Sequence, residues 1–216
     1  MGDTNESVEM YLKRLYEFHL IDPRSSIRTS QLAQAMQVSD ASASEMLVRL
    51  GLRGLVDRVP YKGVTMSAEG VRIASSVKRR EQLLEIFLAD MLGYTGDVNE
   101  AACRLEHAIG DDLESLIDRL LGYPELSHHG DVIPSTGRTV EPFPADVLMP
   151  LRALPDAASG RVSILLFDGG VVRSLQDIGL SSGTIVTRRG DDFEADGSTM
   201  AISDDLTKRI LIRLLA

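Results

Sequence analysis

Apolar residues recur at helical spacing in three segments of the N-terminal third of the chain. These segments are residues 7–21, 29–36 and 39–54, each with its apolar side chains three and four residues apart. Two short alternating runs follow within residues 55–67, around a turn at Lys62-Gly63. Three helices, the last two joined by a short turn, and then a hairpin predict a winged helix-turn-helix domain.

Small polar residues precede the predicted helices, and glycines follow the third. The expected N-caps are Ser7, Thr29 or Ser30, and Ser39. Gly51 and Gly54 lie where the third helix should end. The polar signals therefore support the same three helices as the apolar pattern.

The third predicted helix carries small hydroxyl side chains near its N-terminus, which suits close approach to a DNA groove and to phosphate. The hairpin offers Arg58 and Lys62 to a neighbouring phosphate strand. The candidate DNA-contacting residues are Arg28, Thr29, Ser39, Ser42, Ser44, Arg58 and Lys62. A protein-docking winged domain, or a helical core with an incidental hairpin, is the alternative on these features alone.

Two longer amphipathic segments occupy the middle of the chain. Residues 67–94 predict a long helix, with a break expected near Ser75-Ser76. Residues 98–123 predict a single helix of about 25 residues with a strong apolar stripe. Such a stripe is typical of a dimer interface, and an internal bundle helix is an equally good interpretation.

The last third of the chain changes to a β pattern. Residues 127–150 are rich in proline and glycine and lack periodicity, which indicates a linker. Short alternating runs separated by Gly and Asp follow, and these predict a small β-barrel or sandwich. We therefore expect an α+β protein with four segments. They are a winged-helix domain (1–74), a helical metal-binding and dimerisation domain (75–127), a linker (128–147) and a small β-domain (148–216).

Composition indicates in which cellular compartment the protein acts, but it does not establish the function. The chain is 44% hydrophobic and has one cysteine, so we expect a globular protein of a reducing cytoplasm, with neither a membrane span nor a secretory signal. The net charge is −9, yet residues 1–80 hold 12 Lys/Arg against 9 Asp/Glu, while residues 81–216 hold 11 against 23. The N-terminal third is thus mildly basic, which by itself does not establish DNA binding.

Three metal-ligand side chains gather in the second long helical segment. Cys103, Glu106 and His107 stand at positions i, i+3 and i+4, so a helix presents them on one face. A thiolate, a carboxylate and an imidazole together suit a late first-row divalent ion, and a fourth ligand is needed. The adjacent His128 and His129 are interpreted as solvated, and no zinc-finger, HExxH or phosphate-loop motif occurs.

The segments EMYLKRLYEF (9–18), EAACRLEH (100–107) and GDVIPSTG (130–137), with the winged helix and the β-domain, resemble the diphtheria-toxin-repressor family of metal-dependent transcription regulators. The resemblance covers nearly the whole chain and is strongest over residues 7–137. It implies that the β-domain is SH3-like and that Met10 is the missing ligand. Met10 and Lys13 occupy positions that carry Asp and Glu in the manganese-type branch, so the chain looks iron-type.

The chain departs from the family pattern at a second, ancillary metal site and on the recognition helix. The positions that match the ancillary ligands hold Glu81, Glu85, Asn99, Asp168 and Val171. Asn99 would bind weakly and Val171 not at all, so the resemblance implies an altered, oxygen-rich site that favours a harder ion such as Mn²⁺. Alternatively, Glu81 and Glu85 form a solvated face. Glu45 stands where iron-type relatives carry a glutamine, which implies a different operator because a carboxylate accepts from cytosine N4.

These observations predict a cytoplasmic homodimeric repressor of metal-uptake genes that binds a palindromic operator when Fe²⁺ or Mn²⁺ is bound; Co²⁺, Ni²⁺ and Zn²⁺ are expected to bind in vitro. The ion would tie the DNA-binding domain to the dimer core and so set the spacing of the recognition helices. Two alternatives are a metalloenzyme that uses the Cys/Glu/His trio, and a metal-independent winged-helix regulator in which Cys103 is a core residue or redox sensor.

Overall fold

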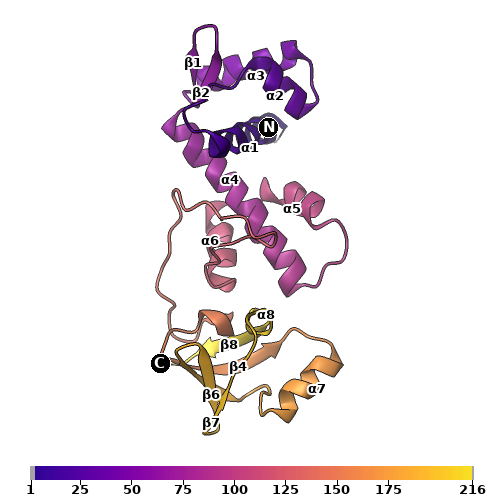
Figure 1. Ribbon diagram of the computed structural model, residues 1–216, viewed down its shortest axis with the longest axis vertical. Coiled ribbons are helices and arrows are strands. Elements are labelled where there is room, and N and C mark those ends of the chain that lie inside the picture. Colours follow the sequence, from indigo (N-terminus) through magenta and orange to yellow (C-terminus); the bar gives the residue numbers. More distant parts are fainter. Residues whose placement is uncertain (1–2, 216) are drawn as a thin grey trace. The chain divides into compact units, whose positions relative to one another are not determined.

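The computed structural model describes residues 3–215, with side chains from Glu6 onward; Met1, Gly2 and Ala216, the ends of the first and last predicted segments, lie outside them. The chain forms two compact units, and each is described by itself (Figure 1). The first unit comprises the chain up to Glu81 with Glu106–Ala108 and Pro134–Arg138. The second comprises Gln82–Leu105, Ile109–Ile133 and the chain from Thr139 onward.

The first unit is the expected winged helix-turn-helix. Its elements are α1 (Asp3–Ile21), α2 (Thr29–Met36), α3 (Asp40–Leu52), β1 (Val56–Val59), β2 (Gly63–Met66) and α4 (Ala68–Ile86) as far as Glu81. The hairpin pairs Val56 with Met66 and Val59 with Gly63. Leu12, Leu15, Leu32 and Leu50 are fully buried at the centre of the helical core, as the apolar spacing predicts.

The wing is fastened to the segment between α1 and α2. Ile27 and Val64 exchange backbone hydrogen bonds of 2.8 and 3.0 Å. Gly63 permits this approach, because a Cβ there would lie 2.0 Å from the carbonyl oxygen of Ile27 and its φ is +118°. The hairpin is therefore held against the helical core rather than projecting as an isolated ribbon.

The helix ends confirm one cap prediction and correct two. The Ser39 hydroxyl accepts a hydrogen bond of 3.1 Å from the amide of Ser42, so Ser39 caps α3 as predicted. Arg28, not Thr29 or Ser30, is the N-cap of α2; its amide donates to the Gln31 side chain at 2.9 Å. The Ser7 prediction is wrong because α1 already begins at Asp3, and polar residues on a solvent-facing helix surface do not stop propagation.

The two long middle helices also differ from expectation. α4 continues through Ser75 because the Ser75 hydroxyl donates to the carbonyl of Arg72 at 2.9 Å, which satisfies it inside the helix. The irregularity comes later, as the π-helical turn η1 (Phe87–Met91). The single helix predicted over residues 98–123 is wrong: α5 (Val98–Glu106) and α6 (Asp111–Leu120) are separate. Gly110 adopts an extended N-cap conformation, and acidic residues in the first turn of α6 favour a new helix start there.

The second unit joins these helices to the predicted small β-domain. Its strands are β3 (Leu148–Pro150), β4 (Ser159–Leu165), β5 (Ile185–Arg189), β6 (Asp192–Ala195), β7 (Ser198–Met200) and β8 (Ile210–Leu214). They form one antiparallel sheet in the order β3-β8-β4-β5-β6-β7. The helical and 3-10 elements between them are η2 (Leu151–Ala153), α7 (Gly169–Asp177) and α8 (Asp204–Thr207).

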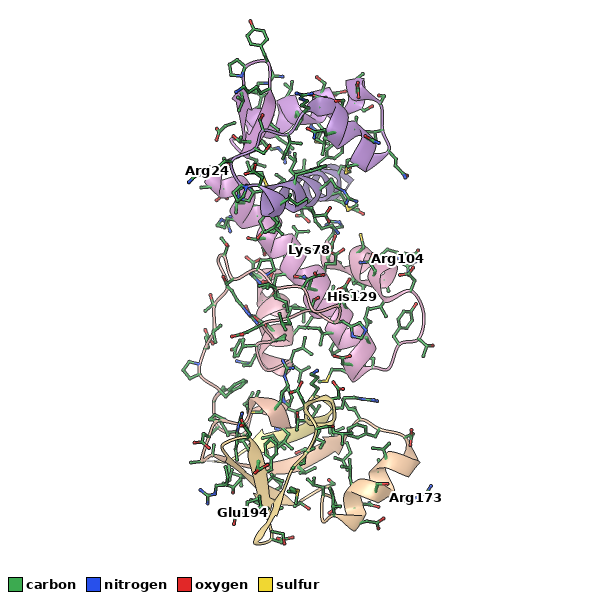
Figure 2. All side chains as sticks on the ribbon, in the orientation of Figure 1. Arg24, Lys78, Arg104, His129, Arg173 and Glu194 are labelled. Carbon is green, nitrogen blue, oxygen red and sulfur yellow. The ribbon has the colours of Figure 1, made fainter. Side chains whose placement is uncertain are left out.

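The β-domain has its own core and a contact with the helices of its unit. Met149, Leu180, Ile210 and Ile212 are fully buried within the β-domain. Leu211 belongs instead to the apolar cluster of α4, α5 and α6. Figure 2 shows charged side chains such as Arg173 on α7 and Glu194 on β6 on the outside of this domain. Over residues 3–215, no helix has both the length and the apolar character needed to span a membrane.

Candidate metal centre and DNA-binding surface

The end of α5 carries the three predicted ligands. Cys103 and Glu106 lie within α5, and His107 follows directly after its last residue. Glu106 is completely buried, and the His107 side chain is 9% exposed. The helix thus places an acid and an imidazole in the interior, where each needs a polar partner.

His107 is held in one orientation by α1. Its Nδ1 lies 2.7 Å from Oε2 of Glu9, so Nδ1 carries a proton and donates it to that carboxylate. Nε2 is buried and makes no hydrogen bond among the described residues, although it lies 3.3 Å from Oε1 of Glu106. With neutral His107, a lone pair and a carboxylate oxygen therefore face each other, an arrangement that a cation satisfies. A carboxylate that fixes the far nitrogen is typical of metal-binding histidines.

Lys13 of α1 places an ammonium group beside the same carboxylate. Its Nζ donates to Oε1 of Glu106 at 2.6 Å and to Oε1 of Glu81 at 3.0 Å. Burial alone would lower the pKa of Lys13, but the charges and hydrogen bonds of Glu106 and Glu81 raise it above the ordinary lysine range. Burial raises the pKa of Glu106, and the Lys13 ammonium opposes that shift. Lys13 is thus a charged group within the predicted centre.

Glu81 of α4 belongs to this cluster. It is buried, and its second oxygen accepts from Lys78 at 2.6 Å; Figure 2 marks Lys78 on α4. Burial raises the pKa of Glu81, but the hydrogen bond from Lys78 and the charge of Lys13 together hold it below its usual value. One ligand atom from each of Glu81, Cys103 and Glu106 lies within 4.8 Å of the others.

These donors suit a divalent transition-metal ion. The group of ligand atoms within 4.8 Å of one another consists of a thiol and two carboxylates, and it does not include His107. His107 adjoins this group through its buried Nε2, which lies 3.3 Å from Oε1 of Glu106. Met10, the ligand implied by the resemblance, is half-buried on α1, one turn before Lys13. Sequence reasoning identified the trio but missed the roles of Glu9 and Lys13.

The predicted DNA-contacting residues lie on α2, α3 and the wing. Ser42, Ser44 and Glu45 are exposed on α3, and Arg28, Arg58 and Lys62 are exposed at the start of α2 and on the wing. A hollow of about 390 Å³ is lined by Thr29, Ser44, Leu47, Arg58, Val59, Pro60, Tyr61, Gly63 and Val64. The fold therefore brings Thr29, Ser44 and Arg58 to one surface, with the fully exposed Tyr61 at the wing turn. Sequence analysis did not consider Tyr61, the aromatic residue next to Lys62-Gly63 in the predicted turn.

Comparisons with known proteins identify the family of this arrangement. Residues 3–64 match the family model described as iron dependent repressor, N-terminal DNA binding domain, and residues 67–135 match the iron dependent repressor, metal binding and dimerisation domain. A solved manganese-dependent transcriptional repressor, in complex with manganese, is 32% identical, with 96% of this chain and 100% of that chain covered and a TM-score of 0.52. The chain belongs to the iron-dependent repressor family.

Two further relatives support the membership. The diphtheria toxin repressor of Corynebacterium glutamicum is 27% identical over 225 residues, which cover 98% of both chains. An HTH-type transcriptional regulator of Methanocaldococcus jannaschii is 31% identical over 110 residues, or 50% of this chain and 87% of the relative. As a member of this family, the protein is a metal-dependent, DNA-binding transcriptional regulator with a dimerisation domain.

In this member of the family, each residue at a predicted ancillary position has its own separate partners. The Asn99 amide donates to Oε1 of Glu85 at 2.9 Å, and Glu85 is buried. Asp168 is exposed and caps α7: its carboxylate accepts from the amides of Val171 and Gly170, and these hydrogen bonds lower its pKa. Thus Glu85 is hydrogen-bonded to Asn99, and Asp168 caps a helix. Glu81 instead accepts hydrogen bonds from Lys13 and Lys78.

Proposed function

We propose that this protein is a homodimeric repressor of metal-uptake genes. It binds its operator when a divalent ion is held by Met10 of α1 together with Cys103, Glu106 and His107. The observation that carries the proposal is His107. Glu9 fixes its Nδ1, while its buried Nε2 points toward Glu106 without a hydrogen bond. A histidine with one nitrogen fixed by a carboxylate and the other facing a possible ligand oxygen has the arrangement of a metal ligand.

We propose Fe²⁺ or Mn²⁺ as the physiological ion. The thiol of Cys103 and the thioether of Met10 favour Fe²⁺, whereas the carboxylates favour Mn²⁺. One solved relative is manganese-dependent by its description, and several relatives are iron-dependent repressors. Co²⁺, Ni²⁺ and Zn²⁺ should also bind in vitro, since nitrogen, oxygen and sulfur sites generally bind these later ions more tightly than Mn²⁺.

When bound, the ion would supply positive charge to ligands from different segments. Residues of the chain position these ligands. Glu9 on α1 orients His107 after α5, and Lys13 on α1 contacts Glu106 at the end of α5. Any change at Glu106 and His107 therefore reaches α1, which packs against α2 and α3 through the core of the DNA-binding domain. This chain of contacts can bias the position of the recognition helix, as a population shift.

We propose that the dimer forms through α5 and α6. Leu105, Leu113 and Leu116 are 43%, 45% and 51% exposed, although leucine at such positions usually packs against another surface. A second copy of the chain would cover them, in keeping with the dimerisation domain matched by the family model. Two recognition helices related by two-fold symmetry read a palindrome, which is why we propose a palindromic operator.

The proposed DNA contacts divide by chemistry. Arg28, Arg58 and Lys62 would contact phosphates, and Glu45 a base edge. The residues proposed to approach the groove or phosphates through hydroxyl groups are Thr29, Ser39, Ser42 and Ser44. The Ser39 hydroxyl also caps α3, so its substitution would affect the helix as well as the contact. We propose that the protein acts in the cytoplasm and is not an enzyme.

The test is binding of the full chain to a fluorescent pool of duplexes, first with chelator and then with Mn²⁺ or anaerobic Fe²⁺. We expect tight binding with metal only, and loss of that response in His107→Gln. His129→Gln is the matched control, because His129 is exposed. Equal binding in chelator and in metal would refute the proposal.

A further inference from the structure

We propose that Lys13 is a built-in competitor for the metal centre, and that Glu81 is a ligand of this centre once Lys13 has withdrawn. The inference rests on the proposed metal-dependent function, and it assigns roles that the metal-binding trio does not require. Its basis is the position of one ammonium group between two buried carboxylates.

The geometry places Lys13 where a cation is needed. Its Nζ lies 2.6 Å from Glu106 and 3.0 Å from Glu81, and these side chains come from α1, α5 and α4. The Lys13 and Glu81 side chains are only 8% and 5% exposed, and that of Glu106 is not exposed at all. Buried carboxylates are costly without a counter-charge, so the ammonium stabilises both of them.

The carboxylates of Glu81 and Glu106 cannot bind the Lys13 ammonium group and a metal ion equally well at the same time. A divalent ion bound by Glu106 would lie close to Lys13, since Nζ is within 2.6 Å of the Oε1 of that ligand. Like charges at such separations repel strongly in a poorly solvated site. Lys13 therefore has to withdraw, which its flexible four-carbon stem allows. Its departure takes one partner from Oε1 of Glu81 and one from Oε1 of Glu106.

Glu81 differs in this respect from Glu85, its neighbour one turn along α4. Glu85 is hydrogen-bonded by the neutral amide of Asn99, whereas Glu81 is held by the ammonium groups of Lys13 and Lys78. Loss of Lys13 leaves Glu81 with Lys78, which still accounts for its second oxygen. The first oxygen is then available to an ion, so we assign Glu81 to the centre of Glu106.

The decisive experiment is a Co²⁺ titration of the chelator-treated full chain, followed by absorption and by calorimetry. Lys13→Gln removes the competitor, so we expect the first Co²⁺ to bind about tenfold more tightly. Lys13→Arg keeps the charge and should stay closer to the wild type. Glu81→Gln should weaken the first Co²⁺ by about tenfold and change its ligand-field spectrum. Glu100→Gln, an exposed carboxylate of α5, is the control and should match the wild type.

Each alternative outcome is distinct. Unchanged or weaker Co²⁺ binding in Lys13→Gln overturns the competitor role. If Glu81→Gln and Glu85→Gln both lose only a second ion and keep the first spectrum, Glu81 serves another centre and the assignment is wrong. A wild-type protein that binds no ion refutes the proposed function itself. Each single variant leaves one buried charge without its partner and could misfold. The double variant Lys13→Gln/Glu81→Gln removes both charges of the pair and avoids this problem. Circular dichroism checks the fold of every variant.

Discussion

Two regions of the first unit use polar residues in opposite ways. In the proposed metal centre, Lys13, Glu81 and Glu106 are buried and joined by short ion pairs. On the proposed DNA-binding surface, Glu45 and Lys62 are exposed on α3 and on the wing. Buried charges depend on each other, because loss of one partner leaves the other without compensation. Exposed charges act nearly independently. Substitutions should therefore affect folding and metal binding in the first region, and only DNA binding in the second.

The largest effect is expected for Glu106→Gln. The change removes the carboxylate that Lys13 contacts at 2.6 Å inside the protein. Breaking a buried ion pair costs about 3 kcal/mol or more. Urea unfolding of the metal-free protein measures this loss, and a Co²⁺ titration should show no tight site. Glu100→Gln should change the free energy of unfolding by less than about 0.5 kcal/mol. Similar unfolding curves for the two variants would remove the distinction between the regions.

Glu9→Gln tests a residue that orients the proposed ligand His107 and is not itself a proposed ligand. Glu9 fixes the proton of His107 on Nδ1, and loss of such a partner lowers metal affinity by about 10- to 100-fold. DNA binding at saturating metal should recover, because the ligands themselves are present. Calorimetry and operator binding over a range of Mn²⁺ concentrations measure both quantities. An unchanged metal affinity would show that Glu9 does not orient His107 for an ion.

Glu45→Gln should change the choice of operator by a smaller amount. A carboxylate accepts from cytosine N4, whereas an amide pairs better with adenine, and one such contact contributes about 1–3 kcal/mol of discrimination. Selection of duplexes from a random pool, with wild type and variant in parallel, measures the preference. Lys62→Ala is the comparison: it should weaken all sequences alike and lower the salt slope by about 1. If the wild type and Glu45→Gln select the same sequences, residue 45 does not contact a base.

The pH dependence of the metal-free protein gives the smallest expected change. The partners of Glu81 hold its pKa below the ordinary value. A lowered folded pKa contributes stability above the ordinary glutamate pKa of about 4.3, and this stability is lost as the pH falls through the folded value. Glu81→Gln should therefore show a shallower loss of stability below about pH 5. Urea unfolding over a pH series measures this, and parallel profiles would contradict the ion network.

Local patterns predicted much of the fold, including the helix order of the winged domain, the Ser39 cap and the strands of the β-domain. They also predicted Cys103, Glu106 and His107 on one helix, and the structure places the first two on α5 and His107 directly after its end. The division between α5 and α6 was missed because the apolar stripe continues across Gly110 and outweighed the glycine and the acidic residues that follow it.

The ion pairs of Lys13 with Glu81 and Glu106 could not be predicted from the spacing of residues along the sequence. Lys13 is 68 residues from Glu81 and 93 residues from Glu106 in the sequence. No periodicity links positions so far apart, so the sequence marked Lys13 only as a departure from the manganese-type pattern and not as a partner of the two carboxylates. The resemblance likewise placed Glu81 with Glu85 because it compares positions, whereas the folded chain gives each carboxylate its own partner.

The central claim is that metal binding and operator binding are coupled in one chain. Coupling is reciprocal, so the factor by which Mn²⁺ strengthens operator binding must equal the factor by which operator strengthens Mn²⁺ binding. We would measure the Mn²⁺ affinity of the full chain with and without a selected operator duplex. The account predicts tighter Mn²⁺ binding with the duplex, by about 5-fold or more. Equal Mn²⁺ affinities in the two conditions would contradict it.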